Sequence, residues 1–205
     1  MKLLSTLLIA ALSTTAFAGP SVGPSKGPVA TPPVEIKCPP LTYTYAEVGY
    51  FHTEVDGPGD PTNSAGYLDL TYDIGKNIFL EGTATAGSGD FDLLDFSAGL
   101  GYYYPITGNF HLTARAGLGY LDLDGADTDF SEFGYYLAPG FRAMVTCNLE
   151  LWGKAFWSEY QNDDGGSWSI GGGLTYHFDE KIGLNGGYSK SEDGWVAQAG
   201  IRFKF

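Results

Sequence analysis

The stretch QAGIRFKF, residues 198–205, alternates apolar and polar side chains up to the last residue of the chain. Ala199, Ile201, Phe203 and Phe205 fall on one face, whereas the other face carries polar residues and a glycine. An apolar face with a period of two marks a half-buried β-strand, and a slip by one residue would exchange the two faces. The stretch therefore predicts a paired strand of fixed register at the end of the chain.

The same alternation restarts after each turn signal along the chain. Short turns alternate with connections that are longer or richer in Gly and Asp, which is typical of outer-membrane barrels with short periplasmic turns and longer external loops. We predict an all-β, transmembrane, antiparallel up-and-down barrel of ten strands, since eight strands would discard two clean runs. Pro139 predicts a bulge or local kink in the sixth run. The runs are 43–54, 66–74, 78–86, 94–104, 110–122, 132–145, 149–160, 168–178, 181–189 and 195–205.

The composition of the two faces indicates which one meets the lipid. The apolar face is aliphatic in the middle of the runs and aromatic at both ends, which fits a bilayer with two interfaces. The opposite face mixes glycines, charges and large rings, as a narrow lumen would require. The aromatic residues are Tyr72, Tyr102, Tyr104, Phe110, Tyr176, Phe178, Phe203 and Phe205 at the turn end, and Tyr50, Tyr120, Phe133, Tyr135, Trp157, Trp168, Tyr188 and Trp195 at the loop end.

The N-terminal region predicts export. Residues 1–18 combine Lys2, a short apolar run and Ala16-Phe17-Ala18, which is the pattern of a cleavable signal peptide. The proline density of residues 19–40 predicts an extended, unpacked periplasmic segment. Residues 41–205 then form the barrel domain.

A family resemblance appears at this point. The ending QAGIRFKF resembles the C-terminal assembly signal of outer-membrane barrels, carried here by Gly200, Phe203 and Phe205. The body, from YTYAEVGYFHTEVD onward, is similar to the small OmpX-like, opacity-type β-barrel proteins. The resemblance implies delivery to the barrel assembly machinery and residence in the outer membrane of a Gram-negative bacterium, amid lipid and lipopolysaccharide. It says little about activity.

Charge separates several classes of partner. The formal net charge of −13 argues against nucleic acid, because no basic cluster neutralises phosphates. The predicted external loops carry sixteen acids against Lys190 alone. Such a surface either bridges to anionic lipopolysaccharide through divalent cations or simply stays solvated. The acids are Glu54, Asp56, Asp60, Asp90, Asp92, Asp95, Asp122, Asp124, Asp127, Asp129, Glu132, Glu159, Asp163, Asp164, Glu192 and Asp193.

No catalytic set or cofactor is predicted. His52, near Glu54 and Asp56, resembles the rim histidine of omptin-type proteases, but those enzymes have longer strands and loops. His111 and His177 point inward and are read as structural. The stretch DLDGADTD, with Asp122, Asp124, Asp127 and Asp129, is a weak candidate for a flexible metal site and lacks the Gly and Glu positions of an EF-hand.

Two features predict the state of the lumen. Cys38 and Cys147 both fall on the periplasmic side, where they either form a disulfide or remain two free thiols. Seven inward charges lie near one level, and buried charges are tolerated chiefly when paired, so we expect an ion lattice that blocks the lumen. The alternative is an open, wet channel. The seven are Glu47, Asp69, Glu81, Arg115, Arg142, Lys154 and Arg202.

Three functions follow from these alternatives. The first is a surface-exposed barrel with a plugged lumen and a structural, adhesive or other interaction role. The second is a narrow, weakly cation-preferring channel of porin type. The third is an outer-membrane hydrolase. It ranks last because no Ser, His and Asp grouping is visible, and the sequence therefore predicts that the chain is not an enzyme.

Overall fold

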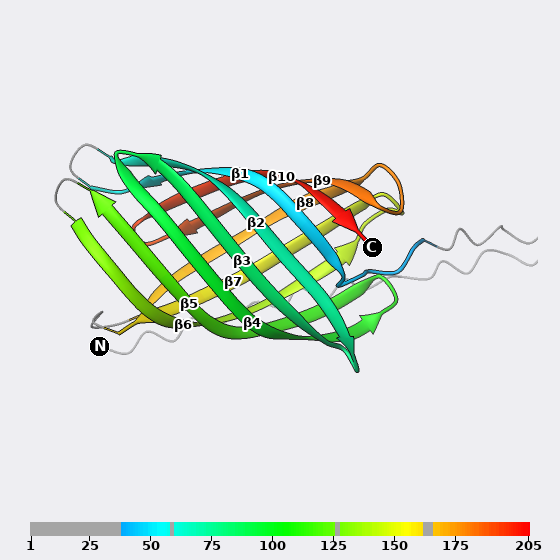
Figure 1. Cartoon of the computed structure of the whole chain (residues 1–205). Coiled ribbons are helices and arrows are strands. Elements are labelled where there is room, and N and C mark those ends of the chain that lie inside the picture. Colours follow the sequence, from blue (N-terminus) through cyan, green and yellow to red (C-terminus); the bar gives the residue numbers. More distant parts are fainter. Residues whose placement is uncertain (1–37, 58–59, 126–127, 162–165) are drawn as a thin grey trace, which may run out of the picture. The chain divides into compact units, whose positions relative to one another are not determined.

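The computed structural model describes residues 38–57, 60–125, 128–161 and 166–205. Within these ranges no helix has both the length and the hydropathy that crossing a membrane demands. Ten strands alternate in direction and tilt around a common axis (Figure 1). They are β1 (Tyr45–Val55), β2 (Thr62–Gly75), β3 (Ile78–Gly89), β4 (Phe91–Thr107), β5 (Phe110–Gly125), β6 (Thr128–Met144), β7 (Leu149–Tyr160), β8 (Ser167–His177), β9 (Ile182–Ser191) and β10 (Gly194–Lys204).

The sheet closes between its first and last strands. β10 pairs antiparallel with both β9 and β1, and the register to β1 runs without a shift from Tyr45 opposite Lys204 to Val55 opposite Gly194. Every strand therefore has two neighbours, which satisfies the backbone groups that the hydrocarbon phase leaves without water. The prediction of a closed ten-stranded antiparallel barrel is confirmed, and the eight-stranded alternative is excluded.

The two faces of the barrel invert the pattern of a soluble protein. Outward positions are apolar and uncovered, as at Leu118 and Ile170, which are 70% and 69% exposed. Inward positions hold charges that are almost fully buried, such as Glu150 at 0% and Arg142 at 4%. The predicted aromatic residues lie outward at both ends, among them Trp168 toward the loop end. This arrangement is that of a transmembrane barrel with a polar interior.

The connections at the two ends differ less than expected. Four short turns join strands at the end where β10 finishes (Figure 1). At the opposite end a single residue, Asp90, joins β3 to β4, and residues 192–193 join β9 to β10. Longer loops were expected there, and at these hairpins that expectation is wrong. β4, β5 and β6 instead extend to 16 or 17 residues, well beyond the 9 to 11 or so that a tilted strand needs to span a bilayer.

Two details of the backbone concern the turn end and Pro139. In the β8–β9 turn, Asp179 accepts hydrogen bonds from the amides of Lys181 and Ile182, both at 2.7 Å, and these bonds lower the pKa of its carboxyl group.

Pro139 in β6 pairs with Ala114 on β5, whereas it has no paired residue on β7. The register to β7 is the same on either side, so the expected bulge is absent. A proline can leave one ladder unpaired without shifting it, because it lacks only its own N–H.

Candidate functional site in the barrel lumen

Large inward rings lie flat across glycines on neighbouring strands. A Cβ atom at Gly101 would overlap the ring of Phe79, and one at Gly99 or Gly117 would overlap Tyr136. Trp152 covers Gly173 and Gly187 in the same way, and Tyr67 covers Gly49 and Gly200. Glycine is therefore needed at these positions because ring and backbone approach more closely than any side chain permits. The rings can then reach across a lumen that would otherwise be too narrow for them.

Glu150 on β7 is the centre of a buried charge cluster. The guanidinium of Arg142 donates two hydrogen bonds to its carboxylate, from Nε to Oε1 at 2.6 Å and from Nη2 to Oε2 at 3.0 Å. His177 Nε2 lies 3.2 Å from Oε2, and Arg202 Nη1 lies 3.6 Å from Oε1. Such a fork-shaped pair is the strongest form of carboxylate recognition, and it fixes both side chains in the lumen.

Glu47 on β1 forms a second cluster beside the first. Its Oε2 accepts from Arg202 Nε at 2.8 Å, and its Oε1 accepts from Tyr67 Oη and Asn185 Nδ2, both at 2.7 Å. Asn185 is held in turn, because its Oδ1 accepts from Trp152 Nε1 at 2.9 Å and from Thr175. Arg202 therefore links the Glu47 and Glu150 clusters into one network that crosses from β1 to β7.

Aromatic rings and guanidinium groups alternate at the turn end of this network, which the sequence predicts to face the periplasm and which is called the periplasmic end below. The Arg142 guanidinium carbon lies 4.6 Å from the centre of the Tyr43 ring, and that of Arg202 lies 4.2 Å from the centre of the Tyr45 ring. Tyr43 stacks on Tyr103 with ring centres 4.2 Å apart, and its hydroxyl lies 3.2 Å from His111 Nδ1. Cation–π contacts of this kind are strengthened where water is excluded.

The chain ahead of β1 crosses the periplasmic mouth as a strap, residues 38–44. Leu41 and Tyr43 are 7% and 3% exposed, so the strap is buried against the lumen. The carbonyl oxygen of Thr42 accepts a hydrogen bond from Arg142 Nη1 at 2.8 Å. The strap thus adds a layer of side chains beneath the charge network.

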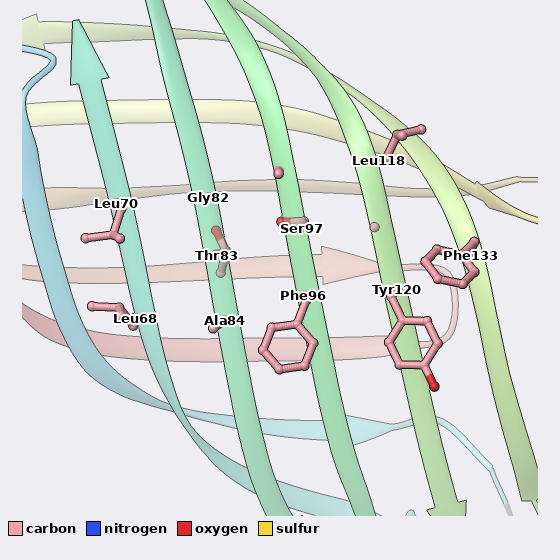
Figure 2. Close-up of a pocket in the computed structure, with 12 residues that line it drawn as sticks. Leu68, Leu70, Gly82, Thr83, Ala84, Phe96, Ser97, Leu118, Tyr120 and Phe133 are labelled. Carbon is pink, nitrogen blue, oxygen red and sulfur yellow. The ribbon is translucent and has the colours of Figure 1, made fainter.

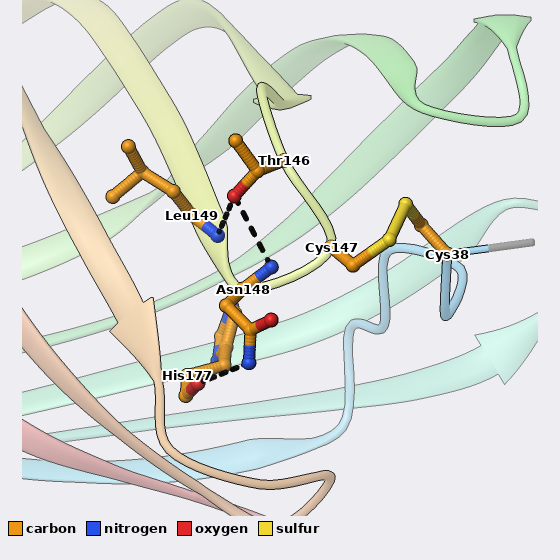
Figure 3. Close-up of a disulfide and its surroundings, with 6 residues drawn as sticks. All are labelled: Cys38, Thr146, Cys147, Asn148, Leu149 and His177. Atoms are coloured by element: carbon orange, nitrogen blue, oxygen red, sulfur yellow. Dashed lines mark hydrogen bonds between the residues drawn. A yellow bond between two sulfur atoms is a disulfide. The ribbon is translucent and has the colours of Figure 1, made fainter. Parts of the chain in front are cut away.

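A disulfide between Cys38 and Cys147 joins the strap to the β6–β7 turn, with the two Cα atoms 4.6 Å apart (Figure 3). β6 is five strands from β1 in either direction, so the bond reaches across the mouth. The turn is itself held in place, because Thr146 Oγ1 accepts from the amide of Leu149 at 3.1 Å and Asn148 Nδ2 donates to the His177 carbonyl at 2.9 Å.

Glu81 organises a further layer toward the external side. Its Oε1 accepts from Tyr136 Oη at 2.7 Å, and its Oε2 lies 3.4 Å from Arg115 Nη1. Tyr136 stacks on Phe156 with centres 5.5 Å apart, and Lys154 Nζ lies 5.9 Å from the Phe156 ring centre. This layer is less tightly paired than the first, since Arg115 makes a single long contact and its Nε has no partner.

Small cavities separate the layers. One, of about 50 Å³, is lined by charged groups that include Asp69, Lys154 and Arg115. A second cavity of about 50 Å³ lies beyond the Tyr136 layer and includes Asp95. Each cavity has room for a water molecule.

Six of the seven charges expected in the lumen line the first cavity, and the seventh, Glu81, pairs with Arg115 beside it. The sequence reasoning missed Glu150, the most connected acid of all. The alternation in 149–160 places Glu150 on the same face as Trp152, so the signal was present. With Glu150 and Glu81 included, four acids stand beside four bases: Glu47, Asp69, Glu81 and Glu150 with Arg115, Arg142, Lys154 and Arg202.

The histidines take separate places in the barrel. His111 and His177 are buried in the periplasmic half of the lumen, at 6% and 4% exposure. His52 lies two residues after the exposed Tyr50 and therefore shares its outward face. There its Nδ1 lies 3.0 Å from Ser64 Oγ, and its ring centre lies 5.6 Å from that of Trp195. Its neighbours are therefore those of a lipid-interface residue.

The acidic stretch at 122–129 lies on strand extensions. Asp122 and Asp124 are in β5, Asp127 lies outside the described residues, and Asp129 opposes Asp124 in the register to β6. Over the described part of the chain, no group of three or more acids, histidines or cysteines has the geometry of a metal site.

The outward face carries a hollow and the C-terminal signal residues. The hollow, of about 380 Å³, lies over β2–β6 where small residues such as Gly82 and Ala84 leave space beside the rings of Phe96 and Tyr120 (Figure 2). It belongs to the lipid-facing belt.

The C-terminal signal residues also lie near the barrel surface. Phe203 and Phe205 are 42% and 75% exposed on the outward face, at the periplasmic end. Gly200 faces inward under Tyr67.

Solved structures with a similar fold include membrane proteins of different roles. An outer membrane channel from Pseudomonas putida F1 is 13% identical, covers 86% of this chain and 100% of its own, and has a TM-score of 0.52. Neisserial surface protein A is 16% identical over 78% of this chain and 96% of its own, with a TM-score of 0.41. The KdgM porin is 11% identical over 78% and 99%, with a TM-score of 0.45.

The search of the curated proteins gave no match. The model of the outer membrane protein beta-barrel domain matches residues 4–155, which is more than half of the chain. Together with the closed barrel and its apolar outer belt, this match shows that the chain belongs to the outer membrane protein beta-barrel family and resides in the outer membrane.

Proposed function

We propose that the protein is a surface-exposed barrel whose lumen is closed, with a structural or interaction role carried by its outer face and its acidic external end. The observation that carries this proposal is the filled periplasmic half of the lumen. There the strap, the Glu150 and Glu47 clusters and the Glu81 layer follow one another along the axis. The proposal further holds that the chain is not an enzyme and that its histidines are structural.

Partners follow from the same surfaces. The outward aromatic and aliphatic belt supports contact with outer-membrane lipid, and the acidic strand extensions favour bridging to lipopolysaccharide phosphates through divalent cations. Phe203 and Phe205 at the end of the closing strand support delivery by the barrel assembly machinery. The motifs that led to the resemblance support an assignment to the small OmpX-like, opacity-type members of the family.

A narrow channel is the second candidate, and one observation favours it. Asp69 and Lys154 line the first lumen cavity without a hydrogen bond to any described residue, so they would face water. If thermal motion joined the two small cavities past Tyr136, a thin aqueous path with charged walls would result.

Electrical recording of the purified protein in a planar bilayer separates the two candidates. We expect no steady conductance from the unmodified protein at physiological salt. A matched variant, Tyr136→Ala, removes the ring between the two cavities and should produce small openings, which shows that the recording would detect a path. Steady, ohmic conductance from the unmodified protein would support the channel and contradict the closed barrel.

A further inference from the structure

The external half of the lumen is built differently from the half that the charge network fills. Its inward positions over β4, β5 and β6 include four half-buried apolar side chains, Leu93, Leu121, Leu123 and Phe130, and one acid, Glu132, which stands opposite Leu121 on β6. Asp95 lies at the inner end of this wall, opposite Leu121, and Leu93 opposes Leu123 one step nearer the external hairpin. An acid therefore stands at the bottom of an apolar track that leads to the outside.

Asp95 has no partner of opposite charge in the part of the chain that the structure describes. Among the described residues, none donates a hydrogen bond to its carboxylate and none forms an ion pair with it. This contrasts with Glu47, Glu81 and Glu150, each of which accepts at least two hydrogen bonds or charge contacts. A partly buried carboxylate without a donor leaves its oxygen atoms free to bind a ligand with N–H groups.

The cavity that Asp95 lines combines three kinds of group. Ser97 and Ser158 supply hydroxyl oxygens, Tyr160 supplies a hydroxyl and a ring, and Phe156 and Tyr136 supply ring walls. Its volume of about 50 Å³ accommodates one ammonium group. Carboxylate, hydroxyl oxygens and aromatic faces each attract an ammonium.

Other ligand classes fit this site less well. An anion would meet Asp95 and the acidic external end. Calcium takes six to eight oxygen ligands and magnesium a near-ideal octahedron, which one carboxylate among aromatic rings does not supply.

We propose that the external half of the lumen is a binding site for a primary alkylammonium. Its charged head lies against Asp95, Ser97, Ser158 and Tyr160, and its alkyl chain lies along the wall of Leu93, Leu121 and Leu123 toward the outside. The acidic strand extensions raise the local concentration of such cations at the entrance. The proposal rests on the residues that line this cavity and not on the closure of the periplasmic half, so its test is separate from the conductance test.

The test uses the full mature barrel in lipid nanodiscs with ¹³C-methyl-labelled leucine, titrated with n-butylammonium chloride. We expect the methyl signals of Leu93 and Leu121 to shift and saturate, with a Kd on the order of 1 mM. The lipid-facing Leu118 should not move, which distinguishes binding from partition into the bilayer. Butanol, which has the same chain and no charge, should produce no saturable shift.

Two variants assign the contacts. Asp95→Asn keeps the size of the side chain and removes its charge, and it should weaken binding at least about tenfold. Asp122→Asn removes the same charge from an outward position on β5 and should change the Kd less than about twofold, since this side chain does not face the lumen. Leu121→Ala should weaken butylammonium binding and leave the weaker binding of plain ammonium unchanged.

Three results would overturn the proposal. The first is equal saturation by the Asp95→Asn variant, checked to be folded by its unheated gel mobility. The second is a shift of Leu118 in proportion to the lumen leucines. The third is equal binding of potassium and butylammonium, which would make the cavity an inorganic cation site in which the apolar wall plays no part.

Discussion

The two halves of the lumen handle buried acids in opposite ways. In the periplasmic half, Glu150 is fully buried and is held by Arg142 and His177. In the external half, Asp95 lines a small cavity with no donor beside it among the described residues. On the two proposals above, closure and stability reside at the periplasmic end, and the external end takes the ligand.

The sharpest test of this difference is to remove one acid from each half. Glu150→Ala leaves the buried Arg142 without its carboxylate, and breaking such a pair costs about 3 to 5 kcal/mol of the free energy of unfolding. Asp95→Asn removes a charge that has no partner, so we expect a change below about 1 kcal/mol. Urea unfolding of the two variants from lipid vesicles measures both. Equal losses would mean that the two halves are not distinct.

A somewhat smaller effect is expected from the strap. Cys38→Ser should lower the free energy of unfolding by about 2 to 4 kcal/mol, because the disulfide closes a long loop in the unfolded chain. The double variant with Cys147→Ser should lose no more than the single one. Mass spectrometry without reductant should first identify a peptide linked through Cys38 and Cys147, and free thiols at both positions would contradict the bond.

The Glu81 layer should contribute less than the Glu150 cluster. Arg115 makes one contact of 3.4 Å and is 22% exposed at the side chain, so Arg115→Ala should cost about 1 to 3 kcal/mol. The same substitution should raise bilayer conductance slightly, because it enlarges the first cavity, which Arg115 lines. A loss as large as that of Glu150→Ala would place the principal closure at Glu81.

The smallest expected effect lies outside the membrane, in the β8–β9 turn. The amides of Lys181 and Ile182 stabilise the ionised form of Asp179, so this stabilisation is present above the ordinary carboxyl pKa and is lost as pH falls through the lowered value. The amide signal of Ile182 should therefore titrate with a midpoint below about 3.9. The step should vanish in Asp179→Ala, and a midpoint at or above the ordinary value would contradict the turn geometry.

The barrel itself could be read from the sequence because its signal is local. Alternation fixes which face each residue takes, and this is enough to place Glu47, Arg142 and Arg202 inward. The pairing of these charges could not be read in the same way. Glu150 lies opposite Met144 in the register and reaches Arg142 diagonally, so the contact depends on how two long side chains lean.

The boundary between the strap and β1 could not be read from the sequence for a related reason. Leu41, Tyr43 and Tyr45 are all buried and keep the spacing of a strand, so the first predicted run includes Tyr43. In the structure β1 begins at Tyr45, and the residues before it leave the sheet to cross the mouth. An alternating pattern indicates which side chains are buried, but it does not show whether the backbone pairs with a neighbouring strand. It therefore does not distinguish a strand from an extended segment that fills a lumen.

The disulfide also alters the connectivity of the chain before the barrel exists. With Cys38 bonded to Cys147, the covalent structure contains a ring that carries β1–β6, and β7–β10 form a linear tail outside it. A chain oxidised before insertion would reach the membrane in this lariat form. In this form β10 would lie in the linear tail and could move freely. β1 would be tethered by the disulfide close to the β6–β7 turn. The two strands that close the barrel would therefore differ in mobility before they pair.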